Sequence, residues 1–290
     1  MNWYRGRTRR DSASPRLNDT HPTHTQTHKV PPGTTTLHSA LHLTNYLNSV
    51  RNCALAHSRF MPISVIIPTY KEAANIARVV EALHRYAPPN GLEVLVVDAH
   101  SPDGTAEIAR RAGATVLQSP QPGRAAQMNF GATQASGDIL YFVHADVGIH
   151  PDYVAAIEAA VAQGHEAGCY RFRLDSPHPL LRINSYGTRF PGIMSRGGDQ
   201  TLFITRALFQ RLGGFDERFV IMEDFDIIVR IRRVASFLII PQDVLVSARK
   251  YETNSWLRVQ LANLTAFSLF FLRVSPGRIA RTYKAMLNHR

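Results

Sequence analysis

Cysteine is nearly absent from this 290-residue chain, which contains only Cys53 and Cys169. The two thiols lie far apart in the sequence and in unlike surroundings, so they indicate neither a disulfide framework nor a zinc cluster. A reducing compartment fits this usage best, and we expect a cytoplasmic protein. Hydrophobic residues make up 44% of the sequence, which is enough for a core of ordinary size. This excludes a small domain whose fold depends on covalent cross-links.

Long apolar runs are also missing. The longest candidate, residues 259–272, is interrupted by Gln260, Asn263 and Thr265, and it is shorter than the roughly 20 residues that a helix needs to cross a bilayer. The first 60 residues contain arginines with no apolar stretch behind them, which is not the pattern of a signal peptide. The sequence therefore predicts neither a membrane-spanning helix nor a secretory leader.

Net positive charge is absent from the middle of the chain, although the whole sequence carries +11. Residues 1–60 contain eight basic and two acidic residues, a net +6, and residues 249–290 contain eight and one, a net +7. The other 17 basic and 19 acidic residues give the middle a net −2. Basic ends favour attraction to an anionic surface, either lipid headgroups or nucleic acid, over a basic groove in a catalytic body. We do not expect nucleic acid to be the main partner.

Composition divides the chain into three parts. Residues 1–60 are rich in Thr, His, Ser, Pro and Arg, which predicts a disordered basic extension with a short helix near residues 37–50. Residues 61–250 alternate between strand and helix patterns and predict one α/β domain. Residues 251–290 predict an amphipathic helical tail, because seven apolar residues at spacings of three and four point to one helical face. These seven are Trp256, Leu257, Leu261, Leu264, Phe267, Phe270 and Phe271.

The first half of the α/β domain alternates four strands with helices. The expected strands are 63–68, 92–98, 115–117 and 139–143, and the expected helices are 71–86, 103–112 and 125–135. This order predicts a parallel, Rossmann-like half-sheet, in which right-handed crossovers bring all strand carboxyl ends to one edge. The second half is less regular. Strands are expected at 170–174 and 201–205, and helices at 206–212 and 223–233.

Polar residues follow three of the four strands. Thr69 to Glu72 come after the first strand, Asp98 ends the second, and His144-Ala145-Asp146 follows the fourth. Asp146 places a hard oxygen ligand at the edge of the sheet where α/β folds bind their ligands. A later helix opens with Glu223, Asp224 and Asp226, where the helix dipole favours acidic residues. A role at the helix N-terminus is enough to explain one acidic residue here, but it does not explain why there are three.

Six short blocks follow one another along residues 61–250. They are SVIIPTYKE at 64–72, VVD at 96–98, GRAAQMN at 123–129, HAD at 144–146, GGFD at 213–216 and ED at 223–224. Their order and spacing resemble the family 2 glycosyltransferases of GT-A fold, which implies a mostly parallel, mixed, Rossmann-like sheet flanked by helices. GRAAQMN and HAD also resemble a bacterial subgroup, some of whose members are named for arsenosugar biosynthesis and others as diaponeurosporenoate glycosyltransferases.

The resemblance implies a nucleotide-diphosphate sugar, expected to be a UDP-sugar, and a Mg²⁺ or Mn²⁺ ion that neutralises the departing diphosphate. Asp146 would bind the metal together with the phosphates, although HAD lacks the first carboxylate of the family's DxD motif. His144 would touch the metal or the ribose, or face inward. The other implied donor contacts are Pro68, Thr69, Tyr70, Glu72, Asp98, Arg124, Ala145 and Arg249.

The resemblance also implies the residues that handle the acceptor. Asp224 would be the general base of an inverting hexose transfer, and Glu223 would orient Asp224 or the acceptor. The loop at residues 197–200 is expected below the acceptor pocket, with Asp199 near the donor sugar. The acceptor itself is left open as a small molecule or a lipid of carotenoid or glycolipid type. Residues 255–286 would lie on the inner face of a membrane, pack on the core, or meet a partner subunit.

Other functions remain as alternatives. A nucleotidyltransferase of similar fold would normally carry a glycine-rich phosphate loop after the first strand, where this chain has Pro-Thr-Tyr-Lys-Glu. A non-catalytic, membrane-surface scaffold would bind UDP without turning over a sugar nucleotide. A dehydrogenase is not expected, because no G-x-G-x-x-G follows the first strand.

Overall fold

A computed structural model describes residues 62–88, 92–190, 192 and 201–288. The expected extension at residues 1–60, its helix near 37–50, and the loop at 197–200 with Asp199 lie outside the described residues. The predicted boundaries of three domains therefore stay predictions. Within the described part of the chain, no helix combines the length and the apolar character that crossing a bilayer requires.

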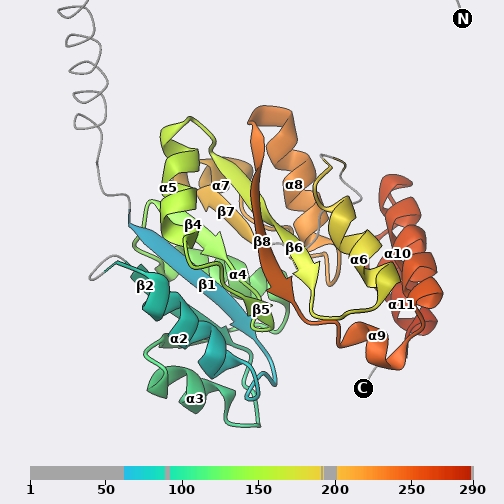
Figure 1. The fold of residues 1–290 in the computed structure, drawn as a ribbon, viewed down its shortest axis with the longest axis horizontal. Helices are drawn as coiled ribbons and strands as arrows, with labels where there is room; N and C mark the ends of the chain where they lie inside the picture. Colours follow the sequence, from blue (N-terminus) through green and yellow to red (C-terminus); the bar gives the residue numbers. More distant parts are fainter. Residues whose placement is uncertain (1–61, 89–91, 191, 193–200, 289–290) are drawn as a thin grey trace, which may run out of the picture. The chain divides into compact units, whose positions relative to one another are not determined.

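A mixed sheet in the order β3-β2-β1-β4-β7-β6-β8-β5 forms the centre of the fold (Figure 1). Its strands are β1 Ile63–Thr69, β2 Leu92–Asp98, β3 Thr115–Gln118, β4 Ile139–Phe142, β5 Val147–Gly148, β6 Ala167–Leu174, β7 Leu202–Thr205 and β8 Phe237–Val246. The first four strands are parallel, as the sequence predicts. β7 joins β4 antiparallel and β6 joins β7 antiparallel, while β8 runs parallel to β6. The predicted mixed α/β sheet is confirmed.

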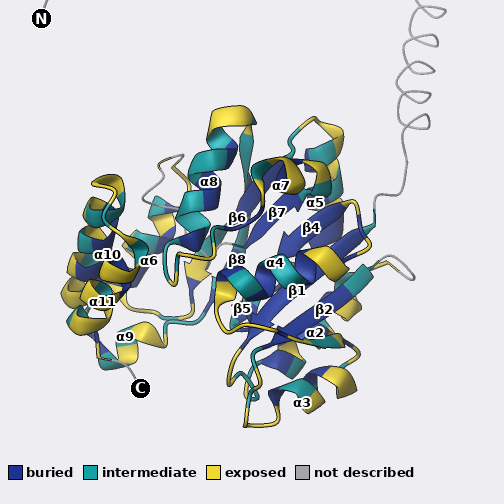
Figure 2. Cartoon of the chain, turned by 180° about the vertical axis from the view of Figure 1, so that it is seen from behind, coloured by how far each residue is buried: buried dark blue, intermediate teal, exposed yellow. Residues whose placement is uncertain are grey.

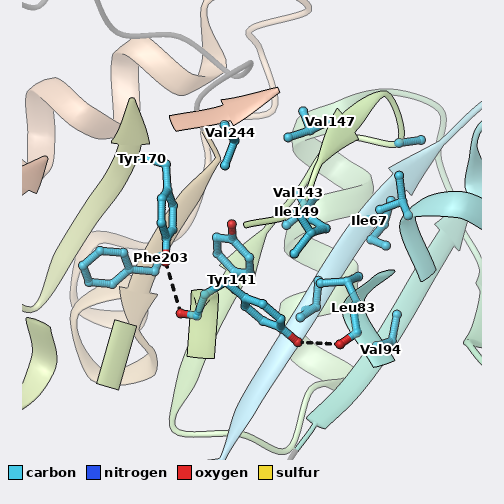
Figure 3. Packing of buried hydrophobic residues seen from close by; sticks show 14 of the residues in the cluster. Ile67, Leu83, Val94, Tyr141, Val143, Val147, Ile149, Tyr170, Phe203 and Val244 are labelled. Atoms are coloured by element: carbon cyan, nitrogen blue, oxygen red, sulfur yellow. Dashed lines mark hydrogen bonds between the residues drawn. The ribbon is translucent and has the colours of Figure 1, made fainter. Parts of the chain in front are cut away.

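Helices cover both faces of this sheet. They are α2 Ile76–Tyr86, α3 Thr105–Arg111, α4 Arg124–Gln134, α5 Tyr153–Ala162, α6 Pro179–Gly187, α7 Arg206–Leu212, α8 Glu223–Val234, α9 Lys250–Thr253, α10 Trp256–Phe271 and α11 Pro276–Met286. Alternating residues of β1 divide the core, since Val65 and Ile67 pack with α2, α3 and α5, and Ile66 packs with α4, α7 and α8. Figure 3 shows the first of these clusters, where the Tyr170 hydroxyl donates to the Tyr153 carbonyl.

The expected helix at 71–86 begins late, at Ile76. Lys71 has a left-handed φ of 57°, which an α-helix does not allow, and the backbone N–H groups of Asn75 and Ile76 both donate to the Glu72 carbonyl. Residues 71–75 therefore form a turn instead of a first helical turn. This correction matters for the site, because the turn carries Glu72.

The C-terminal tail folds into two helices, and the prediction that its seven apolar residues share one helical face is wrong. Leu257, Leu261 and Leu264 are exposed, whereas Phe267 is buried. α10 is apolar around most of its circumference, so one face packs inward while another faces solvent. Spacings of three and four did not separate these faces, because apolar residues continue from one face onto the next.

Candidate active site

A cavity of about 1050 Å³ lies beside the residues that follow β1 and β4. Its other walls come from the first residues of α4 and α8, and from α6 and the helices α9–α11. Segments that are far apart in the sequence thus meet at one place. Seven of the predicted site residues line this cavity: Tyr70, Glu72, Arg124, Asp146, Glu223, Asp224 and Arg249.

The remaining predicted site residues, all within the described ranges, do not line the cavity. Pro68, Thr69 and Asp98 are buried at the ends of β1 and β2, and Ala145 is buried beside Asp146. His144 is half-buried, and its Nδ1 lies 3.5 Å from Nη1 of Arg124. These residues form the layer behind the cavity wall.

Asp98 is held inside the protein, with an exposed fraction of 1%. Its carboxylate accepts hydrogen bonds from the Thr69 hydroxyl at 3.0 Å, and from the Ser101 backbone N–H and hydroxyl at 2.8 and 2.6 Å. Three donors therefore already occupy a carboxylate that can accept about four hydrogen bonds. In the structure Asp98 ties β1 to the loop that follows β2, and only Asp146 and Asp224 of the three predicted key carboxylates face the cavity.

The turn after β1 is fixed by hydrogen bonds to the loop after β2. Its backbone N–H groups at residues 71–73 donate to side chains at distances of 2.9, 2.9 and 3.2 Å, namely those of Ser101, Thr105 and Asp103. The Thr105 hydroxyl also donates to Asp103 and lowers the pKa of that carboxyl below its ordinary value, so Asp103 stays ionised as an acceptor. Tyr70 and Glu72 therefore sit on a well-braced turn at the edge of the cavity.

Two arginines face the cavity beside carboxylates. Nη2 of Arg249 lies 3.4 Å from Oδ2 of Asp146 and 3.5 Å from Oε1 of Glu72. Nε of Arg124 lies 3.0 Å from Oε1 of Glu223. Both arginine side chains keep about half of their surface exposed, at 55% and 42%. A diphosphate entering here would meet two guanidinium groups whose planar donors suit phosphate oxygens.

Asp146 lines the cavity with 29% of its side chain exposed, and carboxylate oxygens are ligands that Mg²⁺ accepts. The described residues contain no group of three or more His, Cys, Asp or Glu side chains able to hold a metal ion. Mg²⁺ prefers six oxygen ligands and keeps several waters, and it commonly binds through one or two carboxylates plus substrate phosphates. The donor set therefore fits a divalent ion that is shared with a diphosphate.

The three carboxylates at the start of α8 have three different surroundings. Glu223 is buried, with 1% exposed, and pairs with Arg124. Asp226 pairs with Arg230 one turn later, with an N–O distance of 2.7 Å. Asp224 is half-buried and lines the cavity. The three acidic residues therefore differ in their contacts and are not redundant helix caps.

Two residues of the GRAAQMN block were not predicted to have roles. Nε2 of Gln127, which is buried, donates to the Thr69 carbonyl at 2.9 Å and to the Val97 carbonyl at 2.7 Å. Asn129 exchanges two hydrogen bonds of 2.9 Å with the backbone of Phe215 in the GGFD block. The polar residues of this block could have indicated these contacts, because a buried polar side chain on a helix that packs against a sheet must find hydrogen-bond partners.

The half of the cavity that is lined by α6 and α9–α11 was not predicted from the sequence. There, neutral polar side chains of α6, α10 and α11 and the tyrosine of α9 line the wall, together with apolar ones. The Tyr251 hydroxyl accepts hydrogen bonds from Asn184 at 3.0 Å and Gln260 at 3.4 Å, and the Tyr283 hydroxyl donates to Asn263 at 3.1 Å. These amides and phenols come from separate helices, so no sequence motif unites them.

Solved structures define the class of protein to which this fold belongs. The mannosyltransferase PcManGT from Pyrobaculum calidifontis, determined with GDP-Man and Mn²⁺, aligns with a TM-score of 0.58 at 20% identity, over 79% of this chain and 70% of that one. Glucosyl-3-phosphoglycerate synthase from Mycobacterium tuberculosis, determined with Mg²⁺ and UDP, aligns with a TM-score of 0.52 at 20% identity, over 71% and 79%. The fold is the GT-A fold of glycosyltransferases.

Sequence comparison identifies the family. The family model described as Glycosyl transferase family 2 matches residues 64–212, and a second model, Glycosyltransferase like family 2, matches residues 188–286. The chain belongs to glycosyl transferase family 2, a class of sugar-transferring enzymes. This confirms the predicted family and leaves the proposed bacterial subgroup as a prediction.

The curated relatives support the same family. Glycosyltransferase AglE of Haloferax volcanii is 39% identical over 99 residues, which cover 32% of this chain and 33% of that protein. An uncharacterized glycosyltransferase of Mycobacterium tuberculosis is 30% identical over 177 residues, which cover 58% of this chain and 68% of the relative. The chain thus spans about a third of the first relative and two thirds of the second.

Proposed function

We propose that this protein is an inverting glycosyltransferase that moves a hexose from a nucleoside diphosphate sugar, expected to be a UDP-sugar, to an acceptor oxygen. The observation that carries the proposal is the single cavity that joins Arg124, Asp146 and Arg249 to Asp224. Cationic groups and a hard oxygen ligand suit the diphosphate. A cavity-facing carboxylate on the other side suits the acceptor.

The donor end is proposed to form around Asp146. Solved structures of the same fold carry GDP-Man with Mn²⁺ or UDP with Mg²⁺, which supports a nucleotide bound together with a divalent ion. Such an ion would supply positive charge to the leaving diphosphate. Arg249 would leave its ion pair with Asp146 and bind a phosphate oxygen instead. The exposed ring of Tyr70 would stack on the nucleotide base.

Asp224 is proposed as the general base. The acceptor oxygen forms a bond to C1 of the sugar, the bond from C1 to the phosphate oxygen breaks, and Asp224 takes the acceptor proton. Glu223 would hold Arg124 at the start of α4 through their 3.0 Å ion pair. The acceptor is not identified by this half of the cavity, so the carotenoid and arsenosugar acceptors of the resembled subgroup stay predictions. A cytoplasmic location is proposed on the sequence alone.

The test begins with calorimetry of Mn²⁺ and UDP. Because the described residues offer no metal cluster of their own, Mn²⁺ alone should bind weakly or not at all, and UDP should raise its affinity strongly. The full chain should then hydrolyse or transfer sugar from at least one member of a UDP- and GDP-sugar panel. Asp146→Ala should abolish both the UDP-dependent Mn²⁺ binding and the turnover.

The alternative outcomes are distinct. UDP binding without turnover of any donor, unchanged in Asp146→Ala, would favour the non-catalytic scaffold. Release of pyrophosphate from a nucleoside triphosphate and a sugar phosphate would identify a nucleotidyltransferase. Tight binding of Mn²⁺ without nucleotide would contradict the shared metal site.

A further inference from the structure

The helix α10 has two apolar faces. Its inner face, which includes Val259, Ala262, Ala266 and Phe267, is buried against the rest of the protein. Its outer face leaves five large apolar side chains between 49% and 73% exposed, namely those of Leu257, Leu261, Leu264, Phe271 and Leu272. Four of them recur at helical spacing on α10, with the exposed Ser268 between Leu264 and Phe271, and Leu272 directly follows the helix. Figure 2 shows exposed residues along this helix and α11. Scattered exposed leucines are common, but a row of them along one helical face marks an interaction surface.

The α10–α11 hairpin is also strongly basic. The sequence contains no Asp or Glu after Glu252. Arg258 of α10 is exposed, and the basic residues of α11 are exposed at three-residue intervals, opposite the buried Ile279 and Ala280. These basic residues are Arg278, Arg281 and Lys284. Apolar side chains beside exposed basic side chains complement the headgroup region of an anionic bilayer.

The cavity reaches this hairpin. Gln260 and Phe267 of α10 and Tyr283 of α11 line it together with Ile183 of α6. Ile183 is 62% exposed, so the cavity has an apolar edge at α6, and two further α6-side rings, Tyr186 and Phe190, are more than half exposed. An acceptor with an apolar body and a polar head matches this gradient from Ile183 to the carboxylate of Asp224.

The inner face of α10 contacts the segment that carries Asp224. The rings of Phe267 and Phe225 meet edge to face with centroids 4.6 Å apart, and those of Phe270 and Phe219 lie 5.7 Å apart. Phe225 directly follows Asp224 in the sequence. The helix whose outer face is exposed therefore also supports the proposed general base.

We propose that the α10–α11 hairpin docks on an anionic lipid bilayer through the outer face of α10 and the basic residues of α11, and that the acceptor is an amphiphile held in that bilayer. The second clause rests on the proposed glycosyltransferase function, whereas the docking does not. The outer leucines enter the interface, and the arginines and lysine meet lipid phosphates. The polar head of the acceptor enters the cavity between α6 and α10.

Flotation of the full chain with lipid vesicles tests the docking. One vesicle is pure phosphatidylcholine, and the other is an equal mixture of phosphatidylcholine and phosphatidylglycerol. Wild-type protein should bind the mixed vesicle at least about tenfold more tightly. The double variant Leu261→Gln/Leu264→Gln should lose about tenfold in affinity for the mixed vesicle, and Arg278→Gln/Arg281→Gln should lose the preference for anionic lipid.

Matched controls keep this test interpretable. Val234→Gln changes an apolar side chain that is 56% exposed on α8, and it should bind vesicles like wild type. Because residues 1–60 are basic too, all comparisons use the full chain. UDP binding and thermal unfolding establish that each variant is folded. Asp224→Asn should still float, so loss of turnover and loss of docking are separable results.

Two results would overturn the docking proposal. One is equal vesicle binding by wild type and the double leucine variant. The other is a wild-type dimer in solution that Leu261→Gln/Leu264→Gln converts to a monomer, which would show that a second copy of the chain covers α10. The claim that the acceptor is an amphiphile has its own test. It is contradicted if turnover with a water-soluble acceptor exceeds turnover with lipid extract, and if adding vesicles does not change the turnover of that soluble acceptor.

Discussion

At the scale of single residues, surroundings separate side chains that look equivalent in the sequence. Glu223 and Asp224 are neighbours that both line the cavity, yet Glu223 is buried against Arg124 and Asp224 is half-buried. A buried carboxylate with a fixed cationic partner holds structure in place. A half-buried carboxylate that lines a cavity lies where an incoming hydroxyl group can reach it.

Substitution of these two neighbours should therefore have different effects. Asp224→Asn should lower kcat by about 10²–10⁴-fold, because it removes the proton acceptor, and should leave UDP affinity and thermal stability nearly unchanged. A carboxylic acid acceptor is already ionised near neutrality, so with such an acceptor the loss should be much smaller. Steady-state kinetics with the acceptor found by product analysis provide the measurement.

Glu223→Gln is the matched comparison. It keeps the size of the side chain but removes the negative charge that pairs with Arg124. We expect the unfolding free energy to fall by about 1–3 kcal/mol, because Arg124 is only partly exposed and water can replace the lost ion pair only in part. Denaturant unfolding of both variants gives the readout. Greater destabilisation by Asp224→Asn than by Glu223→Gln would reverse the roles assigned here.

The sequence motifs predicted which residues face the cavity better than they predicted the hydrogen-bond partners of those residues. Asp146 and Asp224 were predicted from the blocks that carry them, and both face the cavity. Asp98 was chosen on the same grounds, but its oxygens accept hydrogen bonds from Thr69 and Ser101. A sequence block places a carboxylate at the end of a strand, but it does not show that Thr69 of the neighbouring strand and Ser101 of the following loop will be its hydrogen-bond partners.

At the scale of elements, α4 acts as a brace between three parts of the fold. Gln127 joins the ends of β1 and β2 through their carbonyls, and Asn129 holds the backbone of Phe215. Gly214 is close enough that an added Cβ would approach Oδ1 of Asn129 to 2.6 Å, so this close approach requires glycine at Gly214. The GRAAQMN and GGFD blocks are thus two sides of one contact.

Gln127→Met should weaken this brace. The change keeps the length of the side chain but removes two hydrogen bonds in a buried setting, which should lower the unfolding free energy by about 1–3 kcal/mol. UDP affinity should also fall, because the end of β1 positions the turn that carries Tyr70. Gln134→Met, an exposed change on the same helix, is the control, and equal stability of the two variants would contradict the bracing role.

Elements of the first half were easier to predict than those of the second. Parallel strands buried on both faces have continuous apolar runs, so β1, β2 and β4 were visible in the sequence. The pairing of β6 with β8 is interrupted by an irregularity between Tyr170 and Arg171, and β5 has only two residues. Short or irregular strands leave little periodicity, and the order of antiparallel neighbours depends on contacts distant in sequence.

At the scale of the whole molecule, the described lining of the cavity comes from the middle of the chain and from its basic C-terminal segment. The basic residues concentrate in 1–60 and 249–290, while the segment between them carries −2. Every described residue that lines the cavity lies between Tyr70 and Asn288. The proposed chemistry therefore depends on residues of the α/β domain and of the C-terminal helices, and we expect the charge of residues 1–60 to act through longer-range attraction.

A variant that begins at Met61 tests this division. It removes +6 of the +11 net charge, but it keeps β1 from its first residue and every described residue that lines the cavity. UDP affinity with Mn²⁺ should change by less than about tenfold, and the unfolding midpoint should stay close to that of the full chain. Vesicle binding should become weaker but keep its dependence on Leu261 and Leu264, since these side chains remain exposed on α10. Two results would contradict this division: a truncated chain that no longer binds UDP, or one whose vesicle binding no longer depends on those leucines. Either result would place part of the binding surface in residues 1–60. The extension would then be part of the functional unit.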